Sequence, residues 1–494
     1  MFPVQAGNIR RVSFATQLFP RINSSLNLET SPNLRADADH KADIDGSGGP
    51  FCGGRSRNKD LLTLFGFISD SQRGASTYAQ LPLFRRSIRK LTQLVERELE
   101  SVGAHEVLLP TLIPQKLWQQ SKRLDRQQDA LEHVYSFKDN ANNELLLGPT
   151  FEESITQLMG DLDPPREQEL PLLLYQTSSK FRYEPNPRFG LIRSNEFLMN
   201  DLYSFDISLD AAKRTYDLMT GVYERIFGLL DLPCLRFESD PGSIGGKYSH
   251  EYQLPVSSGE DHVIQCQSCS YSFNAEMCKQ VGEDFADSSK CIKCSSQNIR
   301  RTQTLELAHT FLLSDTYSNP LKAHIKRDDG TKVNYQMGCF GLGLTRILGA
   351  GLDLYSLVPG GGVENEPANV NFIQMRWPSQ VEPYKLGIVS PARRSKQFNA
   401  GSTIFIEGLT RKILESTRDV DVLIEDRDKD GIFKRLAKLQ SLGIPNIIVV
   451  GQRFLHDTPE VEILSLSSSK KEYDQHWMTE DQAVDFVQRL ENDK

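Results

Sequence analysis

Arginine and glutamate side chains alternate between residues 181 and 206, in the string FRYEPNPRFGLIRSNEFLMNDLYSFD. Arg182 and Glu184 are two residues apart, so on a strand both side chains point to the same face. The planar guanidinium of an arginine can donate to two oxygens of a phosphate or carboxylate, and a carboxylate can accept from an amino group such as that of adenine. Taken alone, this pattern is more often a solvated ladder of salt bridges. A nucleotide site is therefore one of two interpretations.

A further arginine follows a glycine-rich turn. In MGCFGLGLTRILGAG, Gly338, Gly341 and Gly343 lead from a predicted strand into a helix that carries Arg346. Glycines let a backbone approach a ligand closely, and an arginine at a helix start can reach a terminal phosphate. The spacing is neither that of a Walker loop nor that of a Rossmann fingerprint, and close packing of a strand on a helix also requires such glycines.

Four of the eight cysteines form two Cys-x-x-Cys pairs, Cys266 with Cys269 and Cys291 with Cys294, separated by 21 residues. This spacing approximates a zinc ribbon, in which four thiolates surround a tetrahedral ion. Because four thiolates leave no open position for water, the predicted Zn²⁺ is structural. The alternative is that these thiols bind no metal.

Several strings together, in this order and spacing, resemble class II aminoacyl-tRNA synthetases in the version seen in prolyl-tRNA synthetases. Residues 181–206 resemble motif 2 of that class, and residues 337–351 resemble motif 3. The helix from Leu81, the strand from Glu106 and Pro110 resemble the dimer-forming motif 1. LGPTFEES, ESDPGSIGGKYSHEYQL and TLELAHTFLL resemble further segments of prolyl-tRNA synthetases, so that the resemblance covers roughly residues 60–455.

This resemblance implies ATP-dependent activation of proline to prolyl-adenylate and its transfer to tRNA(Pro), with Arg182 and Arg346 as catalytic residues. The alternatives are a synthetase for another small amino acid, such as threonine, and a non-catalytic relative that keeps the fold and binds nucleic acid. The residues implied to bind proline are Thr150, Glu152, Arg182 and His309. Those implied to bind ATP with Mg²⁺ are Arg182, Glu184, Arg193, Phe197, Glu306 and Arg346.

The elements that must position these residues can be predicted from local patterns. Apolar residues at helical spacing predict an amphipathic helix from Leu81 to near Gly103. LLLYQTSSKFRYE and SNEFLMNDLYSFD predict a long antiparallel hairpin. ELLLGPTFEES predicts a buried strand that ends at Gly148, followed by a helix with Thr150 as its N-cap. Past Pro378, strands alternate with helices, which predicts a small α/β domain with a parallel sheet.

The predicted fold class is therefore α+β, a class II catalytic domain built on an antiparallel sheet, plus a C-terminal α/β domain that resembles an anticodon-binding domain. A homodimer through motif 1 is expected. In the C-terminal domain, the implied tRNA contacts are Arg427, Lys434 and Arg435, with a solvated helix face as the alternative. The expected divisions are a leader at 1–59, a catalytic domain at 60–356 with a cysteine-containing insertion at about 264–297, a linker at 357–380 and the anticodon domain at 381–494.

Composition limits the class of protein. With 494 residues, 38% of them hydrophobic and 25% charged, the chain is long enough for two or three globular domains. No stretch approaches the roughly 20 apolar residues of a membrane span, and eight cysteines are too few for a disulfide scaffold. The net charge of −8 does not exclude nucleic acid, since a local basic face suffices.

The first residues have the composition of a mitochondrial presequence. Arg10, Arg11 and Arg21 occur among serines and apolar residues, and no acidic residue precedes Glu29. This predicts a targeting segment and a location in the mitochondrial matrix, with an ordinary disordered tail as the alternative.

Overall fold

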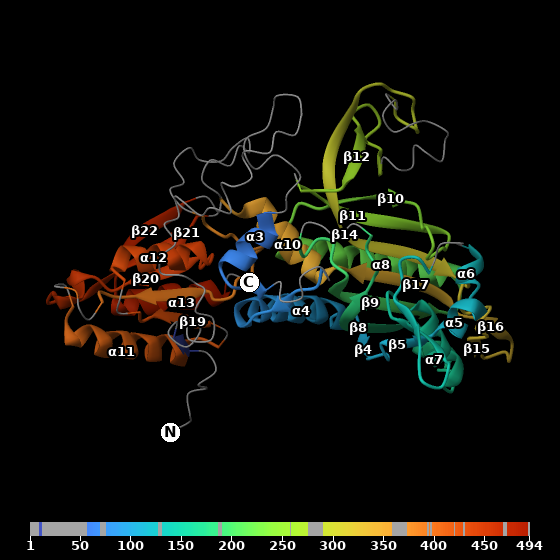
Figure 1. Ribbon diagram of the computed structural model, residues 1–494, viewed down its shortest axis with the longest axis horizontal. Coiled ribbons are helices and arrows are strands. Elements are labelled where there is room, and N and C mark those ends of the chain that lie inside the picture. The colour runs from blue at the N-terminus through green and yellow to red at the C-terminus, as the bar shows by residue number, and fades with distance from the viewer. Residues whose placement is uncertain are drawn as a thin grey trace.

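The computed structural model describes most of the chain (Figure 1). The described residues are 9–11, 57–69, 76–126, 131–185, 190–256, 258–274, 290–357, 373–392, 395, 398–418, 420–427, 430–467 and 472–492. Most of the predicted leader and linker lies outside them. None of the described helices has the length and apolarity that crossing a bilayer requires.

The larger of the two main sheets contains nine strands and the predicted hairpin. Its strands are β4 (His105–Glu106), β8 (Leu172–Phe181), β9 (Glu196–Asp206), β10 (Leu235–Ser239), β11 (Tyr248–Pro255), β12 (Asp261–Cys266), β13 (Ser272–Asn274), β14 (Ile299–Ser314) and β17 (Gln336–Leu342). The strand order is β11-β10-β13-β12-β14-β17-β9-β8-β4, antiparallel except where β4 lies beside β8 and β10 beside β13. The long strand β14 pairs with β12 through its first residues and with β11 through its later ones.

The hairpin of β8 and β9 confirms that prediction, with a register that runs from Leu172 opposite Phe205 to Phe181 opposite Glu196. Strand β8 ends at Phe181, however, so Arg182 and Glu184 lie just beyond the regular strand.

Three long helices, α4 (Pro82–Glu100), α8 (Leu209–Leu229) and α10 (Leu344–Tyr355), pack with the sheet into the main hydrophobic core. The predicted amphipathic helix is confirmed as α4, which buries Leu91, Val95 and Leu99. Pro82 occupies its first turn, where a missing N–H costs nothing, and Gly103 follows its end with a φ of 84°. The short helix α3 (Arg57–Leu64) packs beside α10, ahead of the small pair of β2 (Ile68–Ser69) and β3 (Ala79–Gln80).

A second core contains Trp118, Ile155 and Tyr317 together with side chains from β8, β9 and β17. The elements of this region are β5 (Leu112–Pro114), α5 (Gln115–Gln120), α6 (Arg123–Arg126), β6 (Ser136–Lys138), β7 (Glu144–Leu147), α7 (Glu152–Asp161), η1 (Glu167–Glu169), β15 (His324–Lys326) and β16 (Lys332–Asn334). Strands β5, β7 and β6 form a small sheet in that order.

The predicted N-cap of α7 is wrong. The N-cap residue is Phe151, without a side-chain cap, and not Thr150. Phe151 is buried against Gly148, and its backbone N–H donates to the Tyr203 hydroxyl at 3.0 Å. These contacts fix where the helix begins and leave the Thr150 hydroxyl facing the Glu152 carboxylate.

The C-terminal part forms a separate six-stranded sheet (Figure 1). Its elements are β18 (Leu386–Val389), α11 (Ala400–Ser416), β19 (Val422–Glu425), α12 (Ile432–Ser441), β20 (Asn446–Val449), η2 (Gln452–Leu455), β21 (Glu460–Leu466), β22 (Tyr473–Thr479) and α13 (Glu480–Asn492), with β1 (Ile9–Arg11) at one edge. Strands β1, β19, β18 and β20 are parallel, as predicted for the last three, whereas β21 and β22 add an antiparallel hairpin. Strand β1 lies within the predicted leader.

The two main parts are joined by polar and apolar contacts. Asp421, 7% exposed, accepts hydrogen bonds from Arg86 and, at 3.3 Å, from Lys90 on α4. Leu439 and Leu442 of the C-terminal part belong to the same hydrophobic core as helix α10.

Candidate active site

A cavity of about 840 Å³, with the open solvent at its mouth included, is lined by residues of β9, β14, β17 and the start of α10 and by the segment that follows β8. The nine residues predicted to bind proline or ATP all line it: Thr150, Glu152, Arg182, Glu184, Arg193, Phe197, Glu306, His309 and Arg346.

Two arginines reach this cavity from different elements. Arg182 follows β8, and Arg346 lies in the first turn of α10 after the glycine-rich end of β17. Within the described residues Arg182 makes no salt bridge; its guanidinium lies 5.2 Å from the centre of the Phe197 ring. Burial, and then the charge of Arg346, lower the pKa of Arg182. An arginine nevertheless stays charged, so this part of the cavity can bind an anion.

Arg346 is held in place by main-chain oxygens. Its Nε donates to the Ile192 carbonyl at 2.9 Å and its Nη1 to the Glu306 carbonyl at 3.0 Å. The Glu306 carboxylate lies 3.4 Å from the same Nη1 and 3.1 Å from His309 Nδ1. Burial acts to raise the pKa of Glu306, but His309, Arg346 and Arg182 outweigh it and lower the pKa to about 2. These neighbours therefore favour the ionised form of Glu306.

The two ring nitrogens of His309 have different surroundings. Its Nδ1 faces Glu306, while its Nε2 is buried with no hydrogen-bond partner among the described residues. The ring stacks on Phe311 at 4.0 Å between centres. A buried nitrogen of this kind is available to a ligand.

Arg193 and Glu184 form the outer edge of the cavity. Arg193 Nε donates to Glu184 at 2.7 Å, and its Nη1 to Glu260 at 3.2 Å. Because the Arg193 side chain is about a third exposed, it lies between the cavity and solvent.

The cavity has an anionic corner at Glu152. The Thr150 hydroxyl lies 2.8 and 2.9 Å from the two Glu152 oxygens, and the Cys339 thiol lies 3.3 Å from one of them. Burial would raise the pKa of Glu152, but the neighbouring Arg123 and the Thr150 hydroxyl lower it below the usual range. A buried carboxylate at a cavity wall can receive a cationic amine.

Arg123, which the sequence analysis missed, holds this corner in position. Its Nη2 donates to Glu152 and its Nε to Glu153, both at 2.8 Å, and its guanidinium lies 4.7 Å from the Trp118 ring. Nη2 also donates to the Tyr317 hydroxyl at 2.8 Å. No local pattern marks Arg123, because the partners are brought to it only by the tertiary fold.

A second missed group surrounds Asp201, which lines the cavity. Asp201 accepts from Lys180, from Gln176 at 3.0 Å and from the Tyr203 hydroxyl at 2.9 Å. Burial lowers the pKa of Lys180, although Asp201 opposes that effect. These side chains lie on β8 and β9, where their alternation could have indicated an inward-facing polar row.

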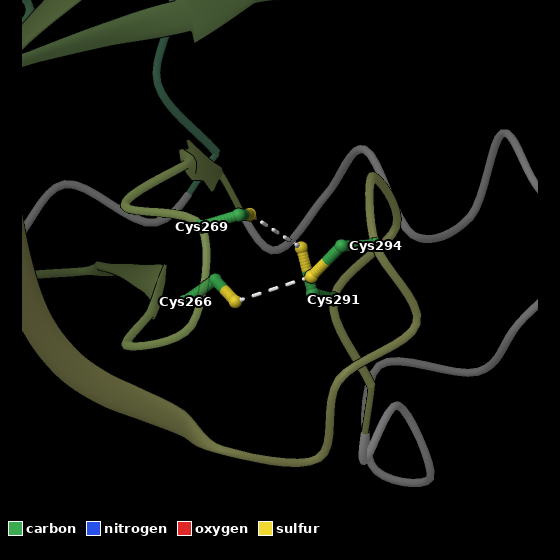
Figure 2. A group of neighbouring side chains, drawn as sticks. All are labelled: Cys266, Cys269, Cys291 and Cys294. Atoms are coloured by element: carbon green, nitrogen blue, oxygen red, sulfur yellow. Dashed lines mark hydrogen bonds between the residues drawn. The ribbon is translucent and has the colours of Figure 1, made fainter.

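The four predicted cysteines come together outside this cavity (Figure 2). Their sulfur atoms all lie within 4.8 Å of one another, in a small cluster beside β12 and β13.

The predicted tRNA-contacting residues lie on and before α12. Lys434 is half exposed and pairs with Asp430 at 2.9 Å, and Arg427 donates to Glu425. Arg435 is only 2% exposed and donates to the carbonyl oxygens of Ser390 and Glu425. The prediction that Arg435 contacts tRNA is therefore wrong, because those carbonyls hold its guanidinium inside the fold.

A family model and similar known proteins point to the same family. The family model of the tRNA synthetase class II core domain (G, H, P, S and T) matches residues 135–355. The probable mitochondrial proline–tRNA ligase of Rattus norvegicus is 35% identical over 84% of this chain and 82% of its own length. That of Homo sapiens is 34% identical over 87% and 84%. The proline–tRNA ligase of Anaplasma phagocytophilum is 30% identical over 80% of this chain and 90% of its own length.

Solved structures agree on the fold. Prolyl-tRNA synthetase from Cryptosporidium parvum, in complex with L-proline and AMP, matches with a TM-score of 0.67 and 13% identity, over 92% of this chain and 80% of that one. The enzyme from Giardia lamblia, in complex with prolyl-adenylate, matches with a TM-score of 0.66 and 17% identity, over 88% and 80%. The predicted class II fold with its antiparallel sheet is thus confirmed.

Proposed function

This chain belongs to the proline–tRNA ligase family, and we propose that it is itself such an enzyme, which joins proline to tRNA(Pro) at the expense of ATP. The observation that carries the proposal is that Arg182, Arg346 and Glu152 face one cavity. Proline brings a carboxylate and a cationic amine, and ATP brings a polyphosphate. Two cations and one buried anion match those charges.

Proline would bind at the Glu152 corner. Its amine faces the Glu152 carboxylate and the Thr150 hydroxyl, with His309 lining the same end of the cavity, while Arg182 holds its carboxylate. The apolar ring of proline would pack against the Phe311 side chain, which also lines the cavity. This assignment makes Thr150, Glu152, Arg182 and His309 the proline-binding residues.

ATP would lie along the arginines. Glu184 and Phe197 receive adenine, Arg182 contacts the α-phosphate, and Arg193 and Arg346 hold the outer phosphates. Glu306 lies beside Arg346 and supplies a carboxylate oxygen, the ligand type that Mg²⁺ prefers. Bound Mg²⁺ would neutralise phosphate charge.

The first reaction step needs no general base, because the proline carboxylate is already a nucleophile. One of its oxygens attacks the α-phosphorus, the bond to the β-phosphate oxygen breaks, and pyrophosphate leaves. Arg182 and Arg346 align the reactants and stabilise the charge that develops. The terminal hydroxyl of the tRNA then attacks the carbonyl of prolyl-adenylate, and AMP leaves.

The C-terminal part, from residue 381, would bind the anticodon arm, with residues 60–356 as the catalytic domain and 357–380 between them. Lys434 is the better candidate for RNA contact because its side chain is half exposed, whereas that of Arg427 is 16% exposed; each would have to exchange its acidic partner, Asp430 or Glu425. Mitochondrial relatives and the basic, acid-free start of the chain support a mitochondrial location, in the matrix, with residues 1–59 as the leader. A structural Zn²⁺ at the four cysteines is the second proposed cofactor besides ATP with Mg²⁺.

The enzyme would act as a homodimer through motif 1. Among the described strands, β4 pairs with β8 alone and forms the edge of the sheet. Next to it Leu108 is 79% exposed and Leu112 is 49% exposed. An unpaired edge with exposed leucines is the kind of surface that a second copy covers.

Proline-dependent exchange of pyrophosphate into ATP tests the proposed reaction, with threonine, alanine and serine as comparison substrates. We expect exchange with proline at the highest kcat/KM. Exchange with threonine and not with proline would contradict the substrate assignment. No exchange with any amino acid would favour a non-catalytic relative.

A further inference from the structure

The four-cysteine cluster has the geometry of a tetrahedral metal site. Cys266 Sγ lies 3.5 Å from Cys294 Sγ, and Cys269 Sγ lies 3.7 Å from Cys291 Sγ (Figure 2). Four sulfurs at about 2.3 Å from one Zn²⁺ are about 3.8 Å apart from each other. A disulfide would need about 2.05 Å. The sulfur spacing therefore fits a shared ion better than two disulfides.

The two Cys-x-x-Cys turns have the same backbone conformation. Cys266 N donates to the Tyr271 carbonyl at 2.9 Å, and Cys291 N donates to the Ser296 carbonyl at 2.8 Å, five residues ahead in each case. In the reverse direction, Ser270 N donates to the Cys266 carbonyl and Ser295 N to the Cys291 carbonyl.

Both serines after these turns have a left-handed backbone. Ser270 and Ser295 each have a φ of 58°, a region that residues other than glycine enter at a cost. A hydrogen bond of 2.8 Å between the hydroxyls of Ser268 and Ser296 links the two turns. The two matching turns face each other and contribute two thiols each. Together they form a preorganised site for one ion.

The residues around the four cysteines indicate a structural role for the ion. We name the cysteine arm as residues 261–274 and 290–304, which contain β12, β13 and the first part of β14; Figure 1 shows it projecting from the sheet. Among the described residues, its own hydrophobic cluster has four buried members, Ile264, Cys266, Phe273 and Cys291. Two of these are the cysteines themselves. So small a core buries little apolar surface, so a metal that joins the two turns would add substantially to the stability of the arm.

We propose that one Zn²⁺, bound by Cys266, Cys269, Cys291 and Cys294, holds the cysteine arm together and anchors the start of β14. Cys266 ends β12 directly opposite Ile299, the first residue of β14, and the same strand continues to Glu306 and His309. The ion stands at the far end of the strand that carries two cavity residues. Its role is structural, because four thiolates leave no position for substrate or water.

The test measures metal in full-length protein purified without chelator. We expect about one zinc per chain by elemental analysis, and loss of most of it in Cys294→Ser, since one ligand of four is missing. The matched control is Cys234→Ser, a cysteine outside the cluster, which keeps its zinc. Trypsin provides a second measurement: Lys293 and Arg301 are exposed on the arm, and cleavage there should speed up at least about tenfold in Cys294→Ser or after chelation, as local opening becomes frequent.

Wild-type protein with no metal and four reduced thiols by mass spectrometry would overturn the inference, and so would two disulfides in freshly purified protein. Unchanged trypsin cleavage after complete zinc removal would overturn the role in holding the arm. Pyrophosphate exchange measured on the same preparations separates the two proposals. Exchange without bound metal refutes the zinc site alone, and bound metal without exchange for any amino acid refutes the proposed reaction alone.

Discussion

Arg182 lies where its own charge is unfavourable. Burial and the charge of Arg346 both lower its pKa, and it has no salt bridge within the described part of the chain. Two cations held close together in a partly desolvated cavity repel each other, and a polyphosphate between them converts that repulsion into attraction. The electrostatic cost of bringing two guanidinium groups together thus indicates that the site binds an anion.

Replacing Arg182 by alanine should lower proline-dependent exchange by at least about 10³-fold, because it removes the group that contacts both reactants. The fold should be kept, since the lost side chain bridges no carboxylate. Exchange kinetics and circular dichroism check this, with the exposed Arg166→Ala as the control. Exchange within about threefold of wild type would refute the assigned role.

Arg123 acts on substrate only through Glu152. In Arg123→Lys the charge remains, but one ammonium cannot donate in the geometry that spans Glu152 and Glu153. We expect KM for proline to rise about 10- to 100-fold, while KM for ATP changes little, as with other positioning residues. Steady-state exchange, measured with proline and ATP varied in turn, gives the two KM values separately. Arg166→Lys is the control. An equal rise in both KM values would argue for general damage to the fold.

For single residues, the sequence predicted which side chains line the cavity wherever the residue belongs to one of the ordered motifs. The nine cavity residues were all placed by the resemblance to prolyl-tRNA synthetases. Arg123 and Lys180 were not found, because their importance comes from contacts across the fold. Arg435 was misjudged for the reverse reason: a charged residue on an amphipathic helix was expected in solvent, but carbonyls of two other segments bind it.

Among the elements, β14 has the widest role. Its first residues belong to the cysteine arm, its middle carries Glu306 and His309, and its later residues pair with β17. Hydrophobic patterns predicted the helix α4, the hairpin of β8 and β9, and the alternation of β18, α11, β19, α12 and β20. They did not give the end of β8 before Arg182 or the N-cap at Phe151, because contacts such as the bond from Phe151 to Tyr203 decide those boundaries.

The edge at β4 can be tested directly. Leu108→Asp places a charge in the proposed dimer interface, so we expect a dimer of wild-type protein and a monomer of the variant, by light scattering after size exclusion. Burying one leucine is worth about 1.5–3 kcal/mol, and burying an unpaired carboxylate costs more. Ile404→Asp, at a residue 74% exposed on α11, should stay dimeric. A dimeric Leu108→Asp variant would contradict the interface.

For the whole molecule, stability should depend on Asp206, a buried carboxyl with an unsatisfied oxygen. Thr215 donates to its Oδ1 at 2.9 Å, and Oδ2 has no partner within the described ranges. Burial raises the pKa of Asp206 to about 6. Since this lies above the unfolded value of about 3.9, the carboxyl stabilises the fold below about pH 4, and that contribution is lost as pH rises through 6.

Asp206→Asn should therefore be more stable than wild type at pH 8, by up to about 3 kcal/mol, and closer to it at pH 5. Urea midpoints at the two pH values measure the difference. Asp210→Asn, on the neighbouring helix α8 and with an 83% exposed side chain, is the control and should leave the stability difference between the two pH values as in wild type. A variant that loses stability at pH 8 would show that the ionised carboxylate has a favourable partner.

The shared core around α10 has a consequence for protein engineering. The helix that carries Arg346 shares one hydrophobic core with Leu439 and Leu442 of the C-terminal part, and Pro378 lies directly on Gly351. A chain shortened after Leu357 would leave these apolar faces in water and would be prone to aggregate. Chimeras that graft a foreign C-terminal half onto this enzyme must therefore also exchange the matching surface of α10.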